Sequence, residues 1–162
     1  MSLPDNIRIE YASFSDIEAM MPLLNLAPGL GSVSFNEVKE SLLEGDTFQV
    51  ALTTNDDIVG VIWWCEWEEG TKGIMSFVVD EEHRNKGVGS KLLAFIDPSE
   101  SSTRNYMTID ADNFKILNFM SSRGYVVTKE FNFGGSVHYN IQKEFIKAKK
   151  ITLRNRLKWR ST

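Results

Sequence analysis

Residues 76–93 read SFVVDEEHRNKGVGSKLL and hold the most informative pattern in the chain. An apolar strand ends at Val79, a polar loop follows, and Arg84-Asn-Lys-Gly-Val-Gly89 leads into a helix. The apolar positions of this helix share one face because they are spaced i, i+4, i+7 and i+8: Val88, Leu92, Phe95 and Ile96. The helix is therefore predicted to pack back on the sheet, with its N-terminus just beyond the end of the strand.

The N-terminus of this helix is predicted to bind a phosphate group. Helix N-termini offer N–H groups without partners and the positive end of the helix dipole. Gly87 and Gly89 have no Cβ where a pyrophosphate would approach the backbone, and Arg84 and Lys86 add positive charge. The alternative is that the glycines only permit a turn, but the order of strand, arginine, spacing and amphipathic helix favours a phosphate site.

Two other phosphate-binding loops fit the sequence less well. A Walker A loop ends in Gly-Lys-Ser/Thr, and Gly89-Ser-Lys91 has the last two residue types in the reverse order. A dinucleotide-binding fingerprint has a third glycine three residues past the second, where this chain has Leu92. Both loops are therefore disfavoured.

The rest of the chain is predicted to alternate strands and helices in the order β-α-α-β-β-β-α-β-α-β-β. Strands are expected at residues 7–12, 47–53, 58–67, 74–79, 106–110, 125–131 and 137–145, and helices at 15–28, 34–45, 87–96 and 113–123. Ser34 and Glu37 have the spacing of a capping box at the start of the second helix. This order predicts an α/β fold with a mixed sheet and helices on both faces.

Charge divides the chain into an acidic body and a basic tail. Residues 143–162 hold eight Lys or Arg and one acid, which leaves a formal charge of −11 in residues 1–142. We expect one domain over residues 1–145 and a tail over residues 146–162. The acidic body favours cationic small molecules as ligands and disfavours nucleic acid. The tail is consistent with contacts to RNA, to an anionic surface, or to the acidic body of the same protomer or of a second protomer in a homodimer, and equally with a solubilising disordered segment.

Composition and targeting signals favour a cytoplasmic protein. The longest apolar runs are far shorter than a membrane span, and the first residues, MSLPDN, lack the basic start and apolar stretch of a signal peptide. Cys65 is the only cysteine, so no internal disulfide is expected. Cys65, His83 and His138 are too few and too scattered to predict a metal site.

Two motifs in their expected slots resemble the GNAT superfamily of N-acetyltransferases. Arg84-Asn-Lys-Gly-Val-Gly89 satisfies the family signature Arg/Gln-x-x-Gly-x-Gly/Ala after the fourth strand. A later helix is similar to the family's second motif at Asn113, Phe119, Gly124 and Tyr125. The element order corresponds over about residues 6–145. The resemblance implies a mixed, mostly antiparallel central sheet of six to seven strands with helices on both faces.

The resemblance also implies acetyl-CoA as co-substrate and a cationic small-molecule or protein amine as acetyl acceptor. Backbone groups of Phe77, Val78 and Val79 would hold the pantetheine arm in a gap between strands 74–79 and 106–110, and Asn113 would contact the arm. The Val79 N–H would polarise the thioester carbonyl. The pyrophosphate would lie on the N–H groups of seven consecutive residues: Arg84, Asn85, Lys86, Gly87, Val88, Gly89 and Ser90.

The catalytic residues depart from the family pattern. Met120 stands where many members have a tyrosine acid, and Met75 stands where many have a glutamate base. Glu66 is the candidate base and Tyr139 the candidate acid, although a solvated carboxylate and a packed ring explain them as well. The alternative function is a GNAT-fold module that binds acyl-CoA without chemistry and docks on nucleic acid or protein through its tail.

Overall fold

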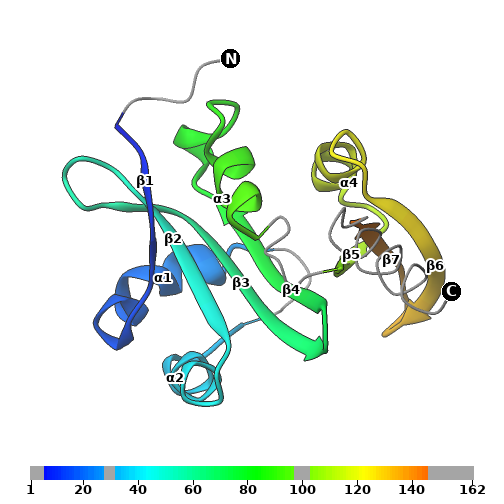
Figure 1. Ribbon diagram of the computed structural model, residues 1–162, viewed down its shortest axis with the longest axis horizontal. Coiled ribbons are helices and arrows are strands. Elements are labelled where there is room, and N and C mark those ends of the chain that lie inside the picture. The colour runs from blue at the N-terminus through cyan, green and yellow to red at the C-terminus, as the bar shows by residue number, and fades with distance from the viewer. Residues whose placement is uncertain (1–5, 28–31, 97–102, 146–162) are drawn as a thin grey trace, which may run out of the picture.

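The computed structural model describes residues 6–27, 32–96 and 103–145, so the predicted tail at 146–162 lies outside the described residues. Its sheet has seven strands in the order β1-β2-β3-β4-β5-β7-β6 (Figure 1). The strands are β1 (Arg8–Tyr11), β2 (Thr47–Leu52), β3 (Ile58–Glu68), β4 (Thr71–Val79), β5 (Arg104–Asp110), β6 (Val126–Phe133) and β7 (Ser136–Glu144). All neighbours pair antiparallel except β4 and β5, which pair parallel. The predicted mixed, mostly antiparallel sheet is confirmed.

Helices cover both faces of the sheet, as predicted. They are α1 (Ile17–Leu24), α2 (Phe35–Leu43), α3 (Val88–Ile96) and α4 (Phe114–Ser121), with short 3-10 turns at Phe14–Asp16 and Glu81–His83. The capping box forms at the start of α2, where Ser34 Oγ accepts the Glu37 N–H at 3.1 Å and Glu37 Oε2 accepts the Ser34 N–H at 3.2 Å. The first helix is shorter than expected and ends at Leu24.

The hairpin between β3 and β4 differs from the prediction. The sequence GTKG at 70–73 suggested a turn, but only Gly70, with a φ of 82°, belongs to it. Gly73 is a strand residue, and a Cβ there would collide with the indole ring of Trp67. Glycine thus serves close ring packing at this position. β4 therefore begins at Thr71, three residues earlier than predicted, and those added residues pair with β5.

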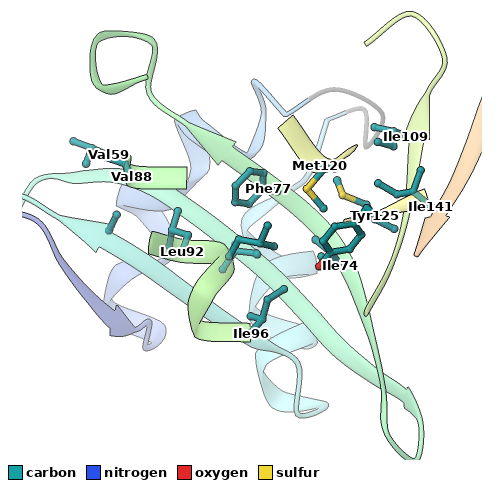
Figure 2. Close-up of a cluster of buried hydrophobic side chains, with 14 of the residues drawn as sticks. Val59, Ile74, Phe77, Val88, Leu92, Ile96, Ile109, Met120, Tyr125 and Ile141 are labelled. Carbon is teal, nitrogen blue, oxygen red and sulfur yellow. The ribbon is translucent and has the colours of Figure 1, made fainter. Parts of the chain in front are cut away.

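Two apolar clusters hold the helices on the sheet. One lies between the sheet and α3 with α4, and Figure 2 shows Leu92, Phe77 and Met120 within it. The other lies between the sheet and α1 with α2 and contains Met20, Val38 and residues of β2, β3 and β4. The second cluster includes no described residue of β5, β6 or β7.

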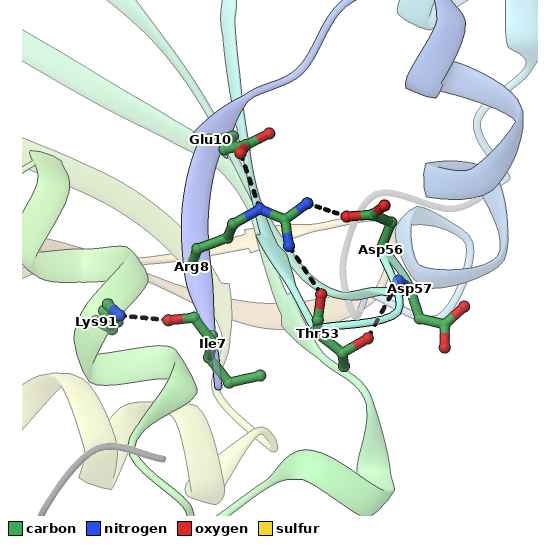
Figure 3. Close-up of polar contacts among 7 residues, drawn as sticks. All are labelled: Ile7, Arg8, Glu10, Thr53, Asp56, Asp57 and Lys91. Carbon is green, nitrogen blue, oxygen red and sulfur yellow. Dashed lines mark hydrogen bonds and ion pairs between the residues drawn. The ribbon is translucent and has the colours of Figure 1, made fainter. Parts of the chain in front are cut away.

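Polar contacts fix β1 and the start of the sheet, as Figure 3 shows. The Arg8 guanidinium donates to Asp56, to Glu10 Oε1 at 2.9 Å and to the Thr53 carbonyl at 2.9 Å. The hydrogen bonds to Asp56 and Glu10 raise the pKa of Arg8. From α3, Lys91 Nζ donates to the carbonyl of Ile7. β1 is thereby tied both to the β2–β3 turn and to α3.

We predict that the packing of α3 contributes strongly to stability. Leu92 is fully buried, whereas Phe95, on the same helix, is half exposed. Leu92→Ala should lower the free energy of unfolding by about 2–5 kcal/mol, because it leaves a cavity in the core. Phe95→Ala is the control and should change it by less than about 1 kcal/mol. Urea unfolding of both variants checks this, and equal losses would contradict the packing of α3.

Candidate active site

A gap opens in the sheet where β4 and β5 part. The two strands pair only from Thr71–Ile74 and Arg104–Met107, although β4 continues to Val79 and β5 to Asp110. On its other edge β4 pairs with β3, where Trp63 lies opposite Ser76 but Trp64 lies opposite Ile74. Met75 is therefore an extra residue, and such a bulge bends its strand. The bulge coincides with the end of β4–β5 pairing, and the predicted gap is present.

Backbone groups of β4 line one wall of this gap. The Asp80 N–H donates to the Val59 carbonyl at 2.8 Å, which sets the alternation of the β3–β4 ladder. By that alternation Val78 directs its N–H and C=O toward β3. Phe77 and Val79 direct theirs away from β3, into the gap. The sequence had assigned all three residues to this wall, but only Phe77 and Val79 present backbone groups to it.

The facing wall belongs to β5. The Ala111 N–H donates to the Val137 carbonyl at 2.9 Å, so the same alternation points the backbone groups of Asp110, past the last β4–β5 pair, into the gap. The Asp110 carbonyl accepts the N–H of Asn113 at 3.0 Å. The gap thus has N–H groups on both sides and no neighbouring strand between them.

The loop from β4 to α3 is held by its own side chains and by one glycine. Arg84 Nε donates to the Val79 carbonyl at 3.0 Å, which leaves the Val79 N–H as the group that this residue offers to the gap. Gly87 has a φ of 85°, a conformation that other residues rarely adopt. Asn85, with a φ of 62°, is one of the few non-glycine types that tolerate it. The first N–H groups of α3 then have no acceptor within the helix.

Gly89 lies where α3 meets two aromatic rings. A Cβ at Gly89 would be 3.2 Å from Phe77 Cζ and 3.4 Å from Phe119 Cζ. The two rings are 5.6 Å apart between centroids. Glycine at this position therefore permits ring packing as well as approach of a ligand, and only the second reason was foreseen from the sequence.

Arg123 adds a positive charge that sequence reasoning missed. Its guanidinium carbon lies 3.5 Å from the centre of the Phe119 ring, and Nη1 donates to the Phe119 carbonyl at 3.1 Å. Nη2 donates to Ser90 Oγ in the first turn of α3. The sequence shows only an arginine before the helix-ending Gly124, so nothing local indicates this contact.

Asn113 caps α4 at the end of the β5 wall. Its Oδ1 accepts the Ile116 N–H at 3.4 Å, which leaves its amide group as the donor for any ligand. Met120, at the family's tyrosine position, is 1% exposed and belongs to the core between the sheet and the two helices (Figure 2). Asn113 thus caps the helix that the family's second motif predicts, and Met120 lies on it. The side chain at position 120, however, is apolar.

The structure does not bring the two catalytic candidates together. Glu66 pairs with Lys72, and its Oε1 accepts the Gly70 N–H at 3.3 Å. Val79 is seven positions past Lys72 on β4, and one of the intervening residues is the bulged Met75, so the distance along the strand is about 20 Å. Tyr139 pairs with Ile109 on the β5 wall, and its ring packs against the cluster under α3 and α4. Tyr139 is thus one strand away from the gap, on the far side of β5, and Glu66 is remote from it.

A histidine and a carboxylate meet at the end of β5, a pair that sequence reasoning did not foresee. His138 Nδ1 lies 2.7 Å from Asp110 Oδ1, and both side chains are mostly buried. His138 Nε2 lies 3.3 Å from the Phe133 carbonyl. The imidazole stacks on Phe131 with centroids 5.5 Å apart. The pairing of Asp110 with His138 across β5 and β7 is a matter of strand register, which no local motif in either strand reveals.

The only cysteine of the chain is unsuited to nucleophilic catalysis. Cys65 pairs with Gly73 in the β3–β4 hairpin, on the same side of the bulge as Glu66. Burial raises the pKa of its thiol, and the negative charge of Asp46 raises it further. The thiolate is the reactive form of cysteine, so both effects disfavour reaction. Among the described residues, no three His, Cys, Asp or Glu side chains gather as a metal site would require.

The comparisons with known proteins agree with this geometry. A family model described as an acetyltransferase (GNAT) domain matches residues 30–145. Ard1 from Thermoplasma volcanium has a similar structure, with a TM-score of 0.76 and 21% identity over 88% of this chain and 99% of that one. No curated protein matched the sequence. In the described ranges, no helix is both long and apolar enough to cross a membrane.

Two further structures with this fold were solved with acetyl-CoA. A GNAT family acetyltransferase from Elizabethkingia anophelis has a TM-score of 0.68 and 18% identity, over 88% of this chain and 100% of that one. A putative acetyltransferase from Salmonella typhimurium has a TM-score of 0.69 and 19% identity, over 88% and 96%. At these identities the likeness concerns the fold.

We predict that Asn113 stabilises the protein as a helix cap, independently of any ligand. Asn113→Ala should lower the free energy of unfolding by about 1 kcal/mol, because the Ile116 N–H loses its acceptor. Asn113→Asp should retain most of that stability, because an aspartate caps equally well. Urea unfolding without ligand checks this, and a loss in Asn113→Asp equal to that in Asn113→Ala would contradict the capping role.

Proposed function

The chain belongs to the GNAT acetyltransferase family, and from this premise we propose that it is an N-acetyltransferase that uses acetyl-CoA. The acceptor in this proposal is a cationic amine, which attacks the thioester directly. The observation that carries the proposal is the gap beside β4, where the N–H groups of Phe77 and Val79 face no neighbouring strand. That gap adjoins the first turn of α3, so a single extended ligand can occupy both.

The co-substrate is proposed to bind mainly through backbone groups. Its pyrophosphate would lie on the N–H groups of residues 84–90, with the positive charge of Arg123 beside them. Its pantetheine arm would run through the gap as an extra strand, paired with Phe77 and Val79. The Asn113 amide would contact the arm from the opposite wall. Gly89 fits this assignment because a larger side chain there would fill the space next to Phe77.

The Val79 N–H is proposed to stabilise the oxyanion that forms when the amine attacks. One such donor is worth about 3 kcal/mol of barrier. Coenzyme A then leaves as a thiolate, and because an unperturbed thiol has a pKa of about 8.5, this step needs little acid assistance. Tyr139 is the proposed proton donor to the thiolate, since its ring lies on the α3–α4 face, one strand away from the gap. Attack is direct in this proposal because Cys65 is remote and its thiol stays protonated.

We predict that acetyl-CoA raises the melting temperature and that Gly89 controls this rise. A ligand that binds only the folded state stabilises it by mass action. Gly89→Glu should abolish the rise, because it places bulk and negative charge against the pyrophosphate. Gly89→Ala is the matched control and should keep most of it, since the two rings need to move by only a few tenths of an ångström. Thermal unfolding with and without acetyl-CoA measures both, and an unchanged rise in Gly89→Glu would remove the phosphate assignment.

We further predict that the protein releases free coenzyme A thiol when it is incubated with acetyl-CoA and an amine acceptor. A panel of alkyl amines, polyamines, lysine-containing peptides and peptides with free N-termini tests the acceptor class. Cationic amines should react best, because the formal charge of residues 1–142 is −11. Thiol release measured with a chromogenic disulfide is the readout. Tight acetyl-CoA binding without release for any acceptor would favour the alternative, a module that binds acyl-CoA without chemistry.

A further inference from the structure

We propose that His138 is the proton acceptor for the attacking amine and that Asp110 is the residue that positions it. This inference rests on the proposed function and supplies the base that Met75 and Glu66 do not. An ammonium ion has no lone pair, so the amine must lose a proton before it can attack the thioester. A base is therefore needed within reach of the Val79 N–H, on a side of the gap that the acceptor can enter.

Strand alternation places the pair beside the gap. Asp110 is three residues past Met107, the last β5 residue that pairs with β4, and Val79 is five residues past its partner Ile74. One of those five is the bulged Met75, so Asp110 and Val79 lie within about one residue of the same level, or about 3 Å along the strands. The two residues thus border the same part of the gap from opposite walls.

The pair lies on the face opposite α3 and α4. Met107 and Ile109 belong to the cluster under those helices, so Asp110, which is next in the strand, points to the other face. His138 is directly across from Asp110 on β7 and shares that face. The helix-covered face is occupied by the packing of Phe77, Phe119 and Gly89.

The His138 face is also the more open of the two around β5 and β7. The cluster under α1 and α2 includes residues of β2, β3 and β4 but no described residue of β5 or β7. Phe133, at the tip of β6, is 74% exposed. With the co-substrate on the α3 side, an acceptor amine approaches the acetyl carbon from the His138 side.

The contacts of the imidazole suit a proton acceptor. Both polar neighbours of the ring can only accept, and the shorter contact to the charged Asp110 Oδ1, at 2.7 Å, holds the proton of the neutral ring on Nδ1 and leaves the lone pair on Nε2. The Phe133 carbonyl, 3.3 Å from Nε2, can also only accept. Once Nε2 has taken a proton, both N–H groups of the imidazolium have an acceptor. The surroundings thus stabilise the product of proton transfer, as a carboxylate does for histidine in other enzymes.

The rings and charges around His138 fit a cationic acceptor. Phe131 stacks on the imidazole and Phe133 meets it edge-on with centroids 6.2 Å apart, so the ring plane is fixed. The exposed face of an aromatic ring also attracts an ammonium ion. On the described parts of β5, β6 and β7, the charged side chains that share this face with His138 are Asp110, Lys129, Arg104 and Glu144. Asp110 contacts the imidazole, Lys129 pairs with Asn140, and Arg104 and Glu144 form an ion pair at the far end of β5 and β7.

His138 Nε2 takes one proton from the ammonium, and the freed nitrogen lone pair forms a bond to the acetyl carbon. The carbon–sulfur bond breaks, and its electron pair leaves with the sulfur as coenzyme A thiolate. Tyr139 gives its proton to that thiolate, which becomes the thiol, and the second amine proton restores the Tyr139 hydroxyl. His138 then releases its proton to water, so each turnover yields an acetamide, coenzyme A and one proton.

Kinetics with a simple acceptor test the inference. n-Butylamine at high concentration is the probe, because proton removal does not require recognition of the rest of an acceptor. At pH 7 we expect His138→Gln to lower kcat/KM for butylamine about 100-fold, with the acetyl-CoA dissociation constant unchanged. The loss should shrink above pH 10, where the amine loses its proton to water. Asp110→Asn should show a smaller loss with the same pH trend, and His83→Gln, at the chain's only other histidine, is the matched control.

The outcomes separate this inference from the proposed function. An equal loss at every pH, or no loss, in His138→Gln would overturn the role of His138 while the native enzyme still turns over. Acetyl-CoA binding without thiol release by the native protein would overturn both. A measurement on the native protein guards against a variant that misfolds: ¹⁵N NMR should show neutral His138 protonated at Nδ1, assigned with His83→Gln. The Nε2-protonated form would overturn the inference.

Discussion

The bulge at Met75 is the constraint on which the rest of the site depends. A regular β4 would continue its parallel pairing with β5 beyond Ile74, and the backbone groups of Phe77 and Val79 would then be consumed by the sheet. The extra residue bends the strand, and it also shifts which side chains face each layer. Ile74 and Phe77, which are three residues apart, both belong to the core under α3 and α4 because of this shift. The gap, its donors and the position of Phe77 against Gly89 are thus consequences of one inserted residue.

Part of this arrangement was predictable from the sequence, for physical reasons. The strand–loop–helix from Val79 to Ile96 is local, and its glycine spacing, apolar face and helix start are all visible in consecutive residues. The Ser34–Glu37 capping box is local in the same sense, and it was found as predicted. α3 also packs on the sheet as predicted, but Leu93 is buried in place of Phe95, which is half exposed. Backbone sites of this kind are set by element order and chain direction more than by side-chain identity.

The parts that could not be predicted depend on register and tertiary packing. Met75 looks like any strand residue until its neighbours on β3 are aligned, and Gly73 looked like a turn until the Trp67 ring was found against it. Asp110 and His138 are 28 positions apart, and their pairing follows only from the β5–β7 register. Arg123, in the turn after α4, reaches Ser90 in α3. The sequence therefore favoured Glu66, a strand carboxylate beside bulky aromatics, which lies on β3 opposite the start of β4, far from Val79.

In the proposed arrangement, the co-substrate occupies the α3 side of the gap and the acceptor amine enters from the opposite face of the sheet. This separation explains how the catalytic residues can depart from the family pattern. The co-substrate needs backbone donors and a helix N-terminus, and these lie on the α3 side, where Met120 merely fills the core. The acceptor needs a base on the opposite face, and three strands border that face near the acetyl carbon. Met75 on β4 cannot supply the base, but in this proposal His138 on β7 does, held by Asp110 on the β5 wall of the same opening. The chemistry requires a proton acceptor at that opening and does not specify the strand that provides it.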